Sequence, residues 1–417
     1  MESTWQQGLE IKSKRPALNT TLSVDVLVIG AGITGITTAY LLSKTKQKVA
    51  LIEKASLHEN SATAFTTAFI TQVIDTDLQK IVDTFGESRA KLVWEAGDKA
   101  IDFIEKTVDE EKIECEFTRC SNFEYAINDS EKEELIKEAK LAKNLGFNVY
   151  FHDKNDLNFP NAGYLETKKQ AKFHPIKYLN GLVEVSEKNG VQFYENTEAK
   201  KINEKGGYIE VETPDSVIAA RNVIVATYSP FNHPLEMYFK GGLYTTYMFE
   251  VNVPKGLLTQ GIYEDSKNPY HYFRIDSKKD FDRIIVGGED HREDVSVDEE
   301  KSFKALEKYL KTILPKTKYK IIRRWTGPIL EPIDGLPYIG EYKKDSHVFV
   351  THGFSGTGMT FGTISALVFR DKIEGRKNKW AKLFDASRAP TIKQLIAKGI
   401  DYSEEFFGAA VKNTISS

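Results

Sequence analysis

The sequence is poor in cysteine, and this shortage removes several classes of protein. Its 417 residues include only Cys115 and Cys120, in the stretch CEFTRC, with no histidine near them in the sequence. Two cysteines cannot build a disulfide framework or a four-thiolate cluster, so we expect ordinary thiols, no metal site and a reducing, cytoplasmic location.

Long apolar runs and an excess of one charge are also missing. No run approaches the roughly 18 apolar residues of a membrane span, and the opening MESTWQQGLEIKSKRP lacks the basic-then-apolar pattern of a signal peptide. The 57 basic and 60 acidic residues nearly balance. We therefore expect no integral membrane segment and no nucleic-acid partner. The length predicts two or three domains.

What the sequence does contain is an α/β pattern near its start. Residues 25–29 and KVALIEK (48–54) are short, nearly continuous apolar runs, typical of strands buried on both faces of a parallel sheet. A helical pattern covers about 33–44 between them. Together they predict a right-handed βαβ unit. The α/β texture returns at RNVIVAT (221–227) and near the C-terminus.

A different texture interrupts this pattern. Helices rich in Lys and Glu are expected over 77–112 and 130–146, with a strand at NFEYAI (122–127) between them. From about 243 to 290, short aromatic or β-branched runs separated by turns predict an antiparallel sheet. The sequence thus predicts an α/β protein, α+β overall, into which an antiparallel sheet is inserted.

The stretch VLVIGAGITGITTAYLL (26–42) carries the strongest motif. Gly30, Gly32 and Gly35 have the G-x-G-x-x-G spacing between an expected strand and an expected helix. This spacing gives a tight turn, close approach of the backbone to a pyrophosphate and close packing of helix on strand. Glu53 ends the next strand 18 residues after Gly35, where an acidic side chain accepts hydrogen bonds from an adenosine ribose. The motif predicts a dinucleotide site.

A second glycine-rich loop lies late in the chain, in THGFSGTGMTFGTISALVFRDKIEG (351–375). It runs into a helical pattern that ends near Ile373, so the positive end of that helix would face whatever lies over the loop. If a flavin lies there, the positive end of the helix would stabilise the negative charge of its reduced state. A plain junction between a loop and a helix is the alternative.

Taken together, these motifs resemble one family. VIGAGITGITTAYLL…VALIEK, SATAFTTA (61–68), VIVAT (223–227), DGLPYIG (334–340) and THGFSGTGMT (351–360) match, in order, the FAD-dependent amino acid and amine oxidoreductases of the D-amino acid oxidase-like family. The branch it is most similar to includes members with an extra Rieske domain. The resemblance spans roughly residues 20–385 and implies a glutathione-reductase-type FAD-binding, Rossmann-like domain with an interleaved substrate domain whose antiparallel sheet covers the flavin.

The resemblance also implies site residues and domain limits. The residues it assigns to FAD are Gly30, Gly32, Ile33, Thr34, Gly35, Glu53, Lys54, Ser61, Ala62, Thr66, Thr67, Ala68, Ala199, Ala226, Thr227, Gly353, Phe354, Gly356, Gly358, Met359 and Thr360. We expect an FAD-binding domain of residues 22–112, 166–236 and 325–385, a substrate domain of 113–165 and 237–324, and a helical tail over 386–417.

The sequence departs from the family pattern in two places. Ser61 and Ala64 stand where the family usually has glycine, and Phe65 stands where it often has histidine. Some relatives link the flavin covalently through Cys or His; because Phe65 cannot, and neither cysteine falls in the relevant segments, we expect noncovalent FAD. A Rieske cluster needs paired C-x-H and C-x-x-H motifs. The stretch CEFTRC, which holds both cysteines, contains neither motif, so we expect the Rieske domain to be missing.

Candidate substrate residues come from the inserted sheet and the late loop. Arg274 in YHYFRID could clamp a substrate carboxylate through its bidentate fork, with Tyr272 on the same strand face two residues away. A surface role for Arg274 is the alternative. His352, beside the late glycine loop, could reach the flavin or the pocket, or simply pack.

The activity that these features favour is oxidation of the C–N bond of an amino acid or secondary amine by hydride transfer to flavin N5, the imine then being hydrolysed. Oxidation of a hydroxy acid on the same scaffold is one alternative, and a flavin-binding subunit with little activity of its own is another. Oxidase relatives such as sarcosine oxidase use a lysine near the flavin. The comparable strand here, RIIVGGEDH, has none, so the acceptor is O2 or another, unknown oxidant.

Overall fold

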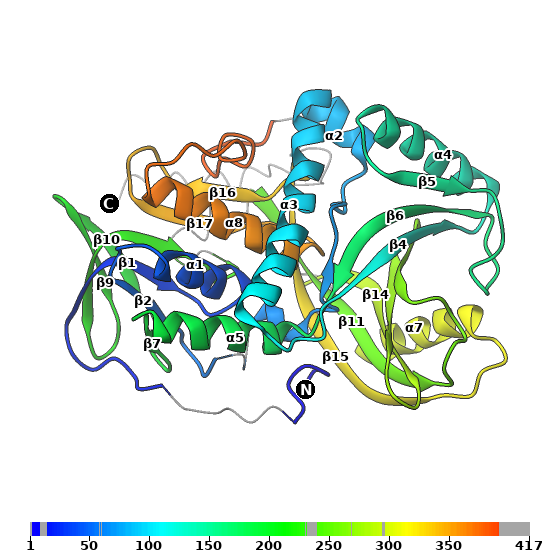
Figure 1. Cartoon of the computed structure of the whole chain (residues 1–417), viewed down its shortest axis with the longest axis horizontal. Helices are drawn as coiled ribbons and strands as arrows, with labels where there is room; N and C mark the ends of the chain where they lie inside the picture. Colours follow the sequence, from blue (N-terminus) through cyan, green and yellow to red (C-terminus); the bar gives the residue numbers. More distant parts are fainter. Residues whose placement is uncertain are drawn as a thin grey trace.

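The computed structural model describes residues 2–8, 15–57, 59, 61–229, 231, 240–267, 269–293 and 297–391. Within these residues the chain forms two sheets, each with its own helices, which lie side by side in Figure 1. The predicted α/β protein with an inserted sheet is therefore confirmed.

The first sheet is built around parallel strands in the order β16-β17-β10-β1-β2-β7. Its members are β1 (Leu22–Ile29), β2 (Val49–Ile52), β7 (Gln192–Tyr194), β8 (Lys201–Lys205), β9 (Tyr208–Glu212), β10 (Val217–Val225), β16 (Tyr338–Glu341) and β17 (Val348–His352). The expected βαβ start is present, because β1 pairs with β2 in parallel and α1 (Ile33–Ser43) connects them. β16 joins β17 antiparallel, and β8 and β9 form an antiparallel extension beside β10.

Buried apolar side chains explain this sheet. All four residues of β2 and the last four of β1 are buried, as strands covered on both faces require. Helices α1 and α8 (Gly358–Ile373) pack on its strands, and α1 also packs on both α8 and α5 (Pro175–Lys188). Helix α3 (Glu87–Glu111) packs on α8 beside this layer (Figure 1). Because β1, β2, β10 and β17 run parallel, their carboxyl ends lie at one edge of the sheet.

The second sheet has the order β15-β11-β14-β13-β12-β4-β6-β3, with β5 beside β6. Its members are β3 (Phe69–Ile70), β4 (Thr118–Ala126), β5 (Val149–His152), β6 (Gly163–Lys172), β11 (Gly241–Val253), β12 (Gly261–Asp265), β13 (His271–Ser277), β14 (Asp282–Arg292) and β15 (Lys320–Pro332). It is antiparallel, as predicted, except that β12 runs parallel to β4. Helices α4 (Asp129–Asn144) and α7 (Glu299–Ile313) pack on it.

Some local expectations need correction. The single helix expected over 77–112 is two helices, α2 (Leu78–Phe85) and α3, because Gly86 between them has a φ of +84°. β6 and β15 belong to the second sheet, although the expected domain limits put residues 166–172 and 325–332 with the cofactor domain. Of the expected tail, residues 386–391 contain no helix, and 392–417 lie outside the described residues.

The centre of the N-terminal turn is buried, which the sequence did not indicate. Residues 2–8 form a turn in which Ser3 and Trp5 are inaccessible to solvent, while Glu2, Gln7 and Gly8 are exposed. The indole of Trp5 lies under the guanidinium groups of Arg274 and Arg283, whose central carbons are 5.1 and 5.0 Å from its ring centre. Trp5 therefore packs against β13 and β14 of the second sheet.

Candidate cofactor and substrate site

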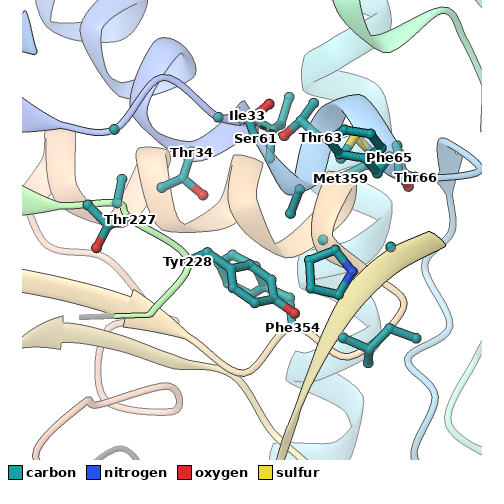
Figure 2. A pocket seen from close by; sticks show the side chains of 18 of the residues that line it. Ile33, Thr34, Ser61, Thr63, Phe65, Thr66, Thr227, Tyr228, Phe354 and Met359 are labelled. Atoms are coloured by element: carbon teal, nitrogen blue, oxygen red, sulfur yellow. Dashed lines mark hydrogen bonds between the residues drawn. The ribbon is translucent and has the colours of Figure 1, made fainter. Parts of the chain in front are cut away.

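A cavity of about 630 Å³ begins at the carboxyl edge of the first sheet and ends against the second sheet. This volume falls in the range of roughly 300–1,000 Å³ typical of cofactor and ligand sites. Figure 2 shows Thr34 and Thr227 toward one end and Phe65, Thr66 and Met359 toward the other. Both glycine-rich segments singled out in the sequence thus face one common space.

The first glycine motif fits a pyrophosphate cradle. Gly30 has a φ of +105°, and a Cβ there would lie 2.6 Å from the carbonyl oxygen of Ala226. A Cβ on Gly35 would lie 1.9 Å from the carbonyl oxygen of Gly30. Gly32, in contrast, faces the cavity, with a virtual Cβ no closer than 3.4 Å to Thr63 Oγ1. The first and third glycines therefore permit packing, and the second leaves room for a ligand.

The N-terminus of α1 is open to an anion. Gly32 is its N-cap and has no side chain to cap it, and the first turn holds no acidic residue. The Ile33 N–H donates to Thr63 Oγ1 at 3.0 Å, which ties the helix to the 61–68 loop. The positive end of the helix dipole therefore lies at the cavity with no acidic side chain in its own first turn.

Glu53 stands at the end of β2, where the motif predicts it. Its carboxylate accepts the Ala31 N–H at 2.8 Å and the Ala55 N–H at 3.2 Å, and it lines the cavity. Two backbone donors fix the carboxylate while each oxygen keeps a further lone pair. This geometry suits acceptance of hydrogen bonds from ribose hydroxyls.

The late loop supplies the opposite wall. Thr357, Gly358 and Met359 at the start of α8 line the cavity, and the first turn of α8 contains no acidic residue. The Gly356 N–H donates to Asp75 Oδ2 at 2.5 Å. Because burial disfavours its charge, the pKa of Asp75 rises to about 6, although that N–H opposes the rise. The helix end faces the cavity as expected of a loop that supports a flavin.

Most residues assigned to FAD lie on this cavity. Those that line it are Gly30, Gly32, Ile33, Thr34, Glu53, Lys54, Ser61, Ala62, Thr66, Thr67, Ala199, Ala226, Thr227, Phe354, Gly356, Gly358 and Met359. The exceptions are Gly35, Ala68, Gly353 and Thr360. Gly35 packs on β1, Gly353 takes a φ of +76° against Pro332, and Thr360 Oγ1 donates to the Thr71 carbonyl oxygen at 2.8 Å. These four shape the backbone without reaching the cavity.

Sequence reasoning missed the residues that reach the cavity from outside the recognised motifs. They are Phe69, Thr71, Val73, Ile74, Asp75, Thr197, Glu198, Lys200, Tyr228, Ser229, Thr246, Met248, Glu264, Tyr270, Gly327, Pro328 and Ile329, among others. Thr63 and Phe65, which also line the cavity, lie inside the recognised 61–68 loop but were not assigned to FAD individually. The others depend on how the two sheets meet.

Buried side chains hold the backbone of the 65–68 loop from below. Trp325 Nε1 donates to the Phe65 carbonyl oxygen at 3.3 Å, and Trp5 Nε1 donates to that of Thr66 at 2.6 Å. Arg274 Nη1 donates to the next two carbonyl oxygens, at 2.9 and 3.0 Å. Four successive carbonyls are thus fixed, so the opposite side of the loop is presented rigidly to the cavity.

This arrangement gives a testable role to the N-terminal turn. Trp5→Phe keeps a large ring but removes the donor to Thr66, so we expect roughly three- to tenfold weaker FAD binding, equivalent to about 0.5–1.5 kcal/mol. Titration of apoprotein with FAD, followed by flavin fluorescence, measures it. Unchanged affinity in a correctly folded Trp5→Phe protein would show that the loop needs no support from this turn.

The expected carboxylate clamp does not fit the position of Arg274. Its side chain is only 2% exposed and does not line the cavity. Besides the loop carbonyls, it donates to the Phe173 carbonyl oxygen at 3.1 Å and to Asp276 Oδ1 at 2.7 and 3.0 Å. With these bonds formed, the guanidinium has no free fork for a substrate. The structure gives Arg274 the role of fixing the cofactor loop.

Asp276 is the counter-ion of a buried cationic cluster. It contacts Arg274, Arg283 at 2.7 Å and Lys172 at 3.2 Å. These three cations hold the pKa of Asp276 well below its usual range against the effect of burial. The charge of Arg274 is therefore balanced by Asp276 within this cluster, which is a second reason why it is not available to a substrate in the cavity.

Tyr272 does line the cavity. Its hydroxyl is 2.8 Å from Thr246 Oγ1, and its ring lies over Gly287, where a Cβ would come within 2.3 Å of it. The glycine on the neighbouring strand therefore makes the space that orients Tyr272. A ring fixed in this way can position a substrate, as the sequence suggested.

His352 does not line the cavity. It is buried and stacks on Tyr338 at 4.9 Å between ring centres. Burial, with the nearby charges of Lys240 and Arg388, lowers the pKa of His352 to about 3. The histidine is neutral at physiological pH and packs against β16, so the simpler alternative stated above describes it.

Other expectations concern metals, membranes and covalent attachment. Among the described residues, no group of three His, Cys, Asp or Glu side chains is placed to hold a metal ion. No described helix combines the length and apolar character needed to span a bilayer. The described residues that line the cavity include neither Cys nor His. That lining fits a cofactor held by noncovalent contacts alone.

The cradle, the ribose acceptor and the covering sheet together define a dinucleotide-dependent oxidoreductase of the flavin type. The comparison with family models agrees, because residues 25–371 match the family described as DAO, FAD dependent oxidoreductase. The chain belongs to this family, and it is an FAD-dependent enzyme.

Curated relatives and solved structures extend the similarity along the chain. The chain is 30% identical to the putative Rieske 2Fe-2S iron-sulfur protein YhfW of Bacillus subtilis, covering 97% of this chain and 79% of that protein. It is 23% identical to gamma-glutamylputrescine oxidoreductase of Escherichia coli, covering 88% and 87%. Glycine oxidase from Geobacillus kaustophilus has the same fold, with a TM-score of 0.73 and 17% identity over 89% of this chain and 100% of that one.

Proposed function

We propose that this enzyme oxidises the C–N bond of a small amine or amino acid. The observation that carries the proposal is the single cavity, in which the dinucleotide cradle and the Tyr272 wall of the second sheet face each other. Relatives named as gamma-glutamylputrescine oxidoreductase and glycine oxidase support the same reaction class.

The cofactor contacts follow from the lining. We assign the pyrophosphate to Gly30, Gly32 and the N-terminus of α1, the ribose to Glu53, and the flavin to the space between the 61–68 loop and the start of α8. When bound, FAD accepts the two electrons of the reaction as a hydride.

The protein's own part is orientation. The substrate must present its C–H bond to the cofactor with the nitrogen lone pair free, so that C–H cleavage and C=N formation are concerted with loss of the hydride. The imine then adds water and releases a carbonyl compound and the second amine or ammonia. We propose Tyr272, held by Thr246, as a residue that orients the substrate over the 61–68 loop.

Anaerobic reduction of the flavin tests the proposal. The yellow holoenzyme is mixed in a stopped-flow instrument with a panel of amines, amino acids and hydroxy acids, and flavin absorbance is followed. We expect bleaching by at least one amine and by no hydroxy acid. Bleaching by hydroxy acids alone, or by nothing in the panel, would reject amine oxidation.

The acceptor is a second proposal. Within the described residues, the lysines that line the cavity are Lys54 and Lys200, both beside the nucleotide-binding residues, and none lies at the substrate wall. Without a cation there to stabilise the charge that develops on oxygen, we expect reduced enzyme to react with O2 roughly tenfold or more slowly than with a quinone or dye acceptor. Double-mixing stopped-flow measures both rates, and fast reoxidation by O2 would identify an oxidase.

A cytoplasmic location is consistent with the state of the cysteines. Cys115 and Cys120 are both free thiols, and burial raises the pKa of each to about 11. Thiols of this kind are unreactive and persist in a reducing compartment. Fractionation of the native host's cells, with the protein detected by antibody, tests this location.

A further inference from the structure

The second sheet brings neighbouring carboxyl groups to the substrate wall of the cavity. Across four neighbouring strands, Glu124 pairs with Glu264, Glu264 with Tyr272, and Tyr272 with Gly287. Directly paired residues point to the same face of a sheet, so two carboxylates stand side by side next to the substrate tyrosine. Like charges in this position destabilise a sheet, which indicates a use other than folding.

A third carboxylate reaches the same space from the other domain. Asp75 and Glu264 both line the cavity. The Asp75 carboxylate lies against Gly356 of the late loop: a Cβ built on that glycine would be 3.0 Å from Asp75 Oδ2. The hydroxyl of Tyr270 would be 3.3 Å from that same Cβ. Tyr270 is partly exposed and lines the cavity. Its hydroxyl therefore lies beside the Asp75 carboxylate where a ligand in the cavity could reach both groups.

No protein cation in the described residues neutralises Asp75, Glu124 or Glu264. His271 and Lys267, on or beside the neighbouring strands, contact Asp265 instead, at 3.0 and 4.0 Å, and His271 also contacts Glu289 at 3.0 Å. Burial, with the nearby carboxylate of Glu124, raises the pKa of Glu264 to about 8. Burial, with the nearby carboxylates of Glu138 and Asp77, raises the pKa of Glu124 to about 7. A cation bound beside Glu264 would favour the charged form of this carboxyl group.

Resting on the proposed function, we infer that the substrate is a di- or polyamine whose second, non-reacting ammonium group is held by Glu264 and Asp75 against the rings of Tyr270 and Tyr272. An ammonium group supplies three donors to these acceptors and is attracted to aromatic faces. An α-amino acid suits this wall poorly. Its carboxylate would meet like charge, and Arg274, the residue expected to bind it, is used elsewhere.

Three four-carbon amines that differ only in their far end test this inference. Holoenzyme is mixed anaerobically with 1,4-diaminobutane, butylamine or 4-aminobutanoate, and the rate of flavin reduction is measured against concentration. We expect the diamine to be preferred over butylamine by roughly tenfold or more, and 4-aminobutanoate to be the poorest. A series of longer diamines then finds the best chain length.

Glu264→Gln is the matching variant, since it keeps the shape and removes the charge. We expect the preference for diamine over butylamine to fall by roughly tenfold while butylamine itself is little affected. Glu133→Gln, on an exposed position of α4, is the control and should change neither. Asp75→Asn gives a second reading if Glu264→Gln does not fold.

The outcomes separate the two proposals. Reduction by amines with butylamine or 4-aminobutanoate equal to or better than every diamine would overturn the charge inference and leave amine oxidation standing. Reduction by none of them, nor by other amines in the panel, would overturn both. A diamine preference that survives both Glu264→Gln and Asp75→Asn would overturn the assignment of these two residues.

Discussion

Gly35→Ala is expected to abolish FAD binding. A Cβ at this position would lie 1.9 Å from the carbonyl oxygen of Gly30, which is backbone and cannot rotate away. The start of α1 must therefore move off the end of β1, and the N–H groups that face the pyrophosphate move with it. Overpacking typically costs about 1–3 kcal/mol and occasionally more. Because the obstructing atom is backbone, we expect a cost of about 3 kcal/mol or more here, which corresponds to roughly 100-fold or greater loss of affinity.

The measurement is the FAD content of purified protein, followed by titration of apoprotein with FAD. Gly206→Ala is the matched control, because a Cβ there meets nothing within 4 Å. Gly32→Ala separates binding from folding. Its Cβ would make only an ordinary contact with Thr63, so the fold should persist while FAD affinity falls. Full FAD occupancy in Gly35→Ala would remove the cradle from this interpretation.

Arg274→Ala is expected to destabilise the whole enzyme. The change leaves Asp276 with fewer counter-charges in a buried site and leaves three carbonyl oxygens, on Thr67, Ala68 and Phe173, without their donor. Loss of one partner from a buried ion pair typically costs about 3–5 kcal/mol. Urea unfolding followed by tryptophan fluorescence, with FAD in saturating amounts, measures the free energy of unfolding.

Arg221→Ala is the control for the loss of an arginine. The Arg221 side chain is 77% exposed and forms one contact of 3.3 Å with Asp25, so a change within about 0.5 kcal/mol is expected. If Arg274 were the carboxylate clamp that the sequence suggested, Arg274→Ala would give the opposite pattern. Stability would be unchanged, and KM would rise strongly for amino acids but not for simple amines.

The cofactor half of the site could be predicted because its signals are local. Gly30, Gly32 and Glu53 lie within two short connections of one βαβ unit, and parallel strands bring all such connections to one edge. The late glycine loop lies at the same edge for the same reason, because it connects β17 to α8. A pattern of a few residues was therefore enough to predict most of the residues that line the cavity beside the first sheet.

The substrate half could not be predicted in the same way. Tyr272 and Arg274 do share a strand face, as expected, but two residues further along a strand is roughly 7 Å further along the sheet. That step moves Arg274 from the cavity to the region beneath the 65–68 loop. Glu264 was missed because its strand, β12, pairs in parallel with β4, which lies far away in the sequence, and no local pattern encodes that register. Asp75 was missed because it lies in the connection between β3 and α2, whose path depends on how the two sheets meet.

Trp5 joins parts of the chain that lie far apart in the sequence. Its buried ring contacts Thr66, in the loop that follows β2, and the guanidinium groups of Arg274 and Arg283 on β13 and β14. Contacts between such distant segments form only after long stretches of chain have been ordered. The 61–68 loop therefore receives this support only when the second sheet is in place, so its rigidity depends on both halves of the fold.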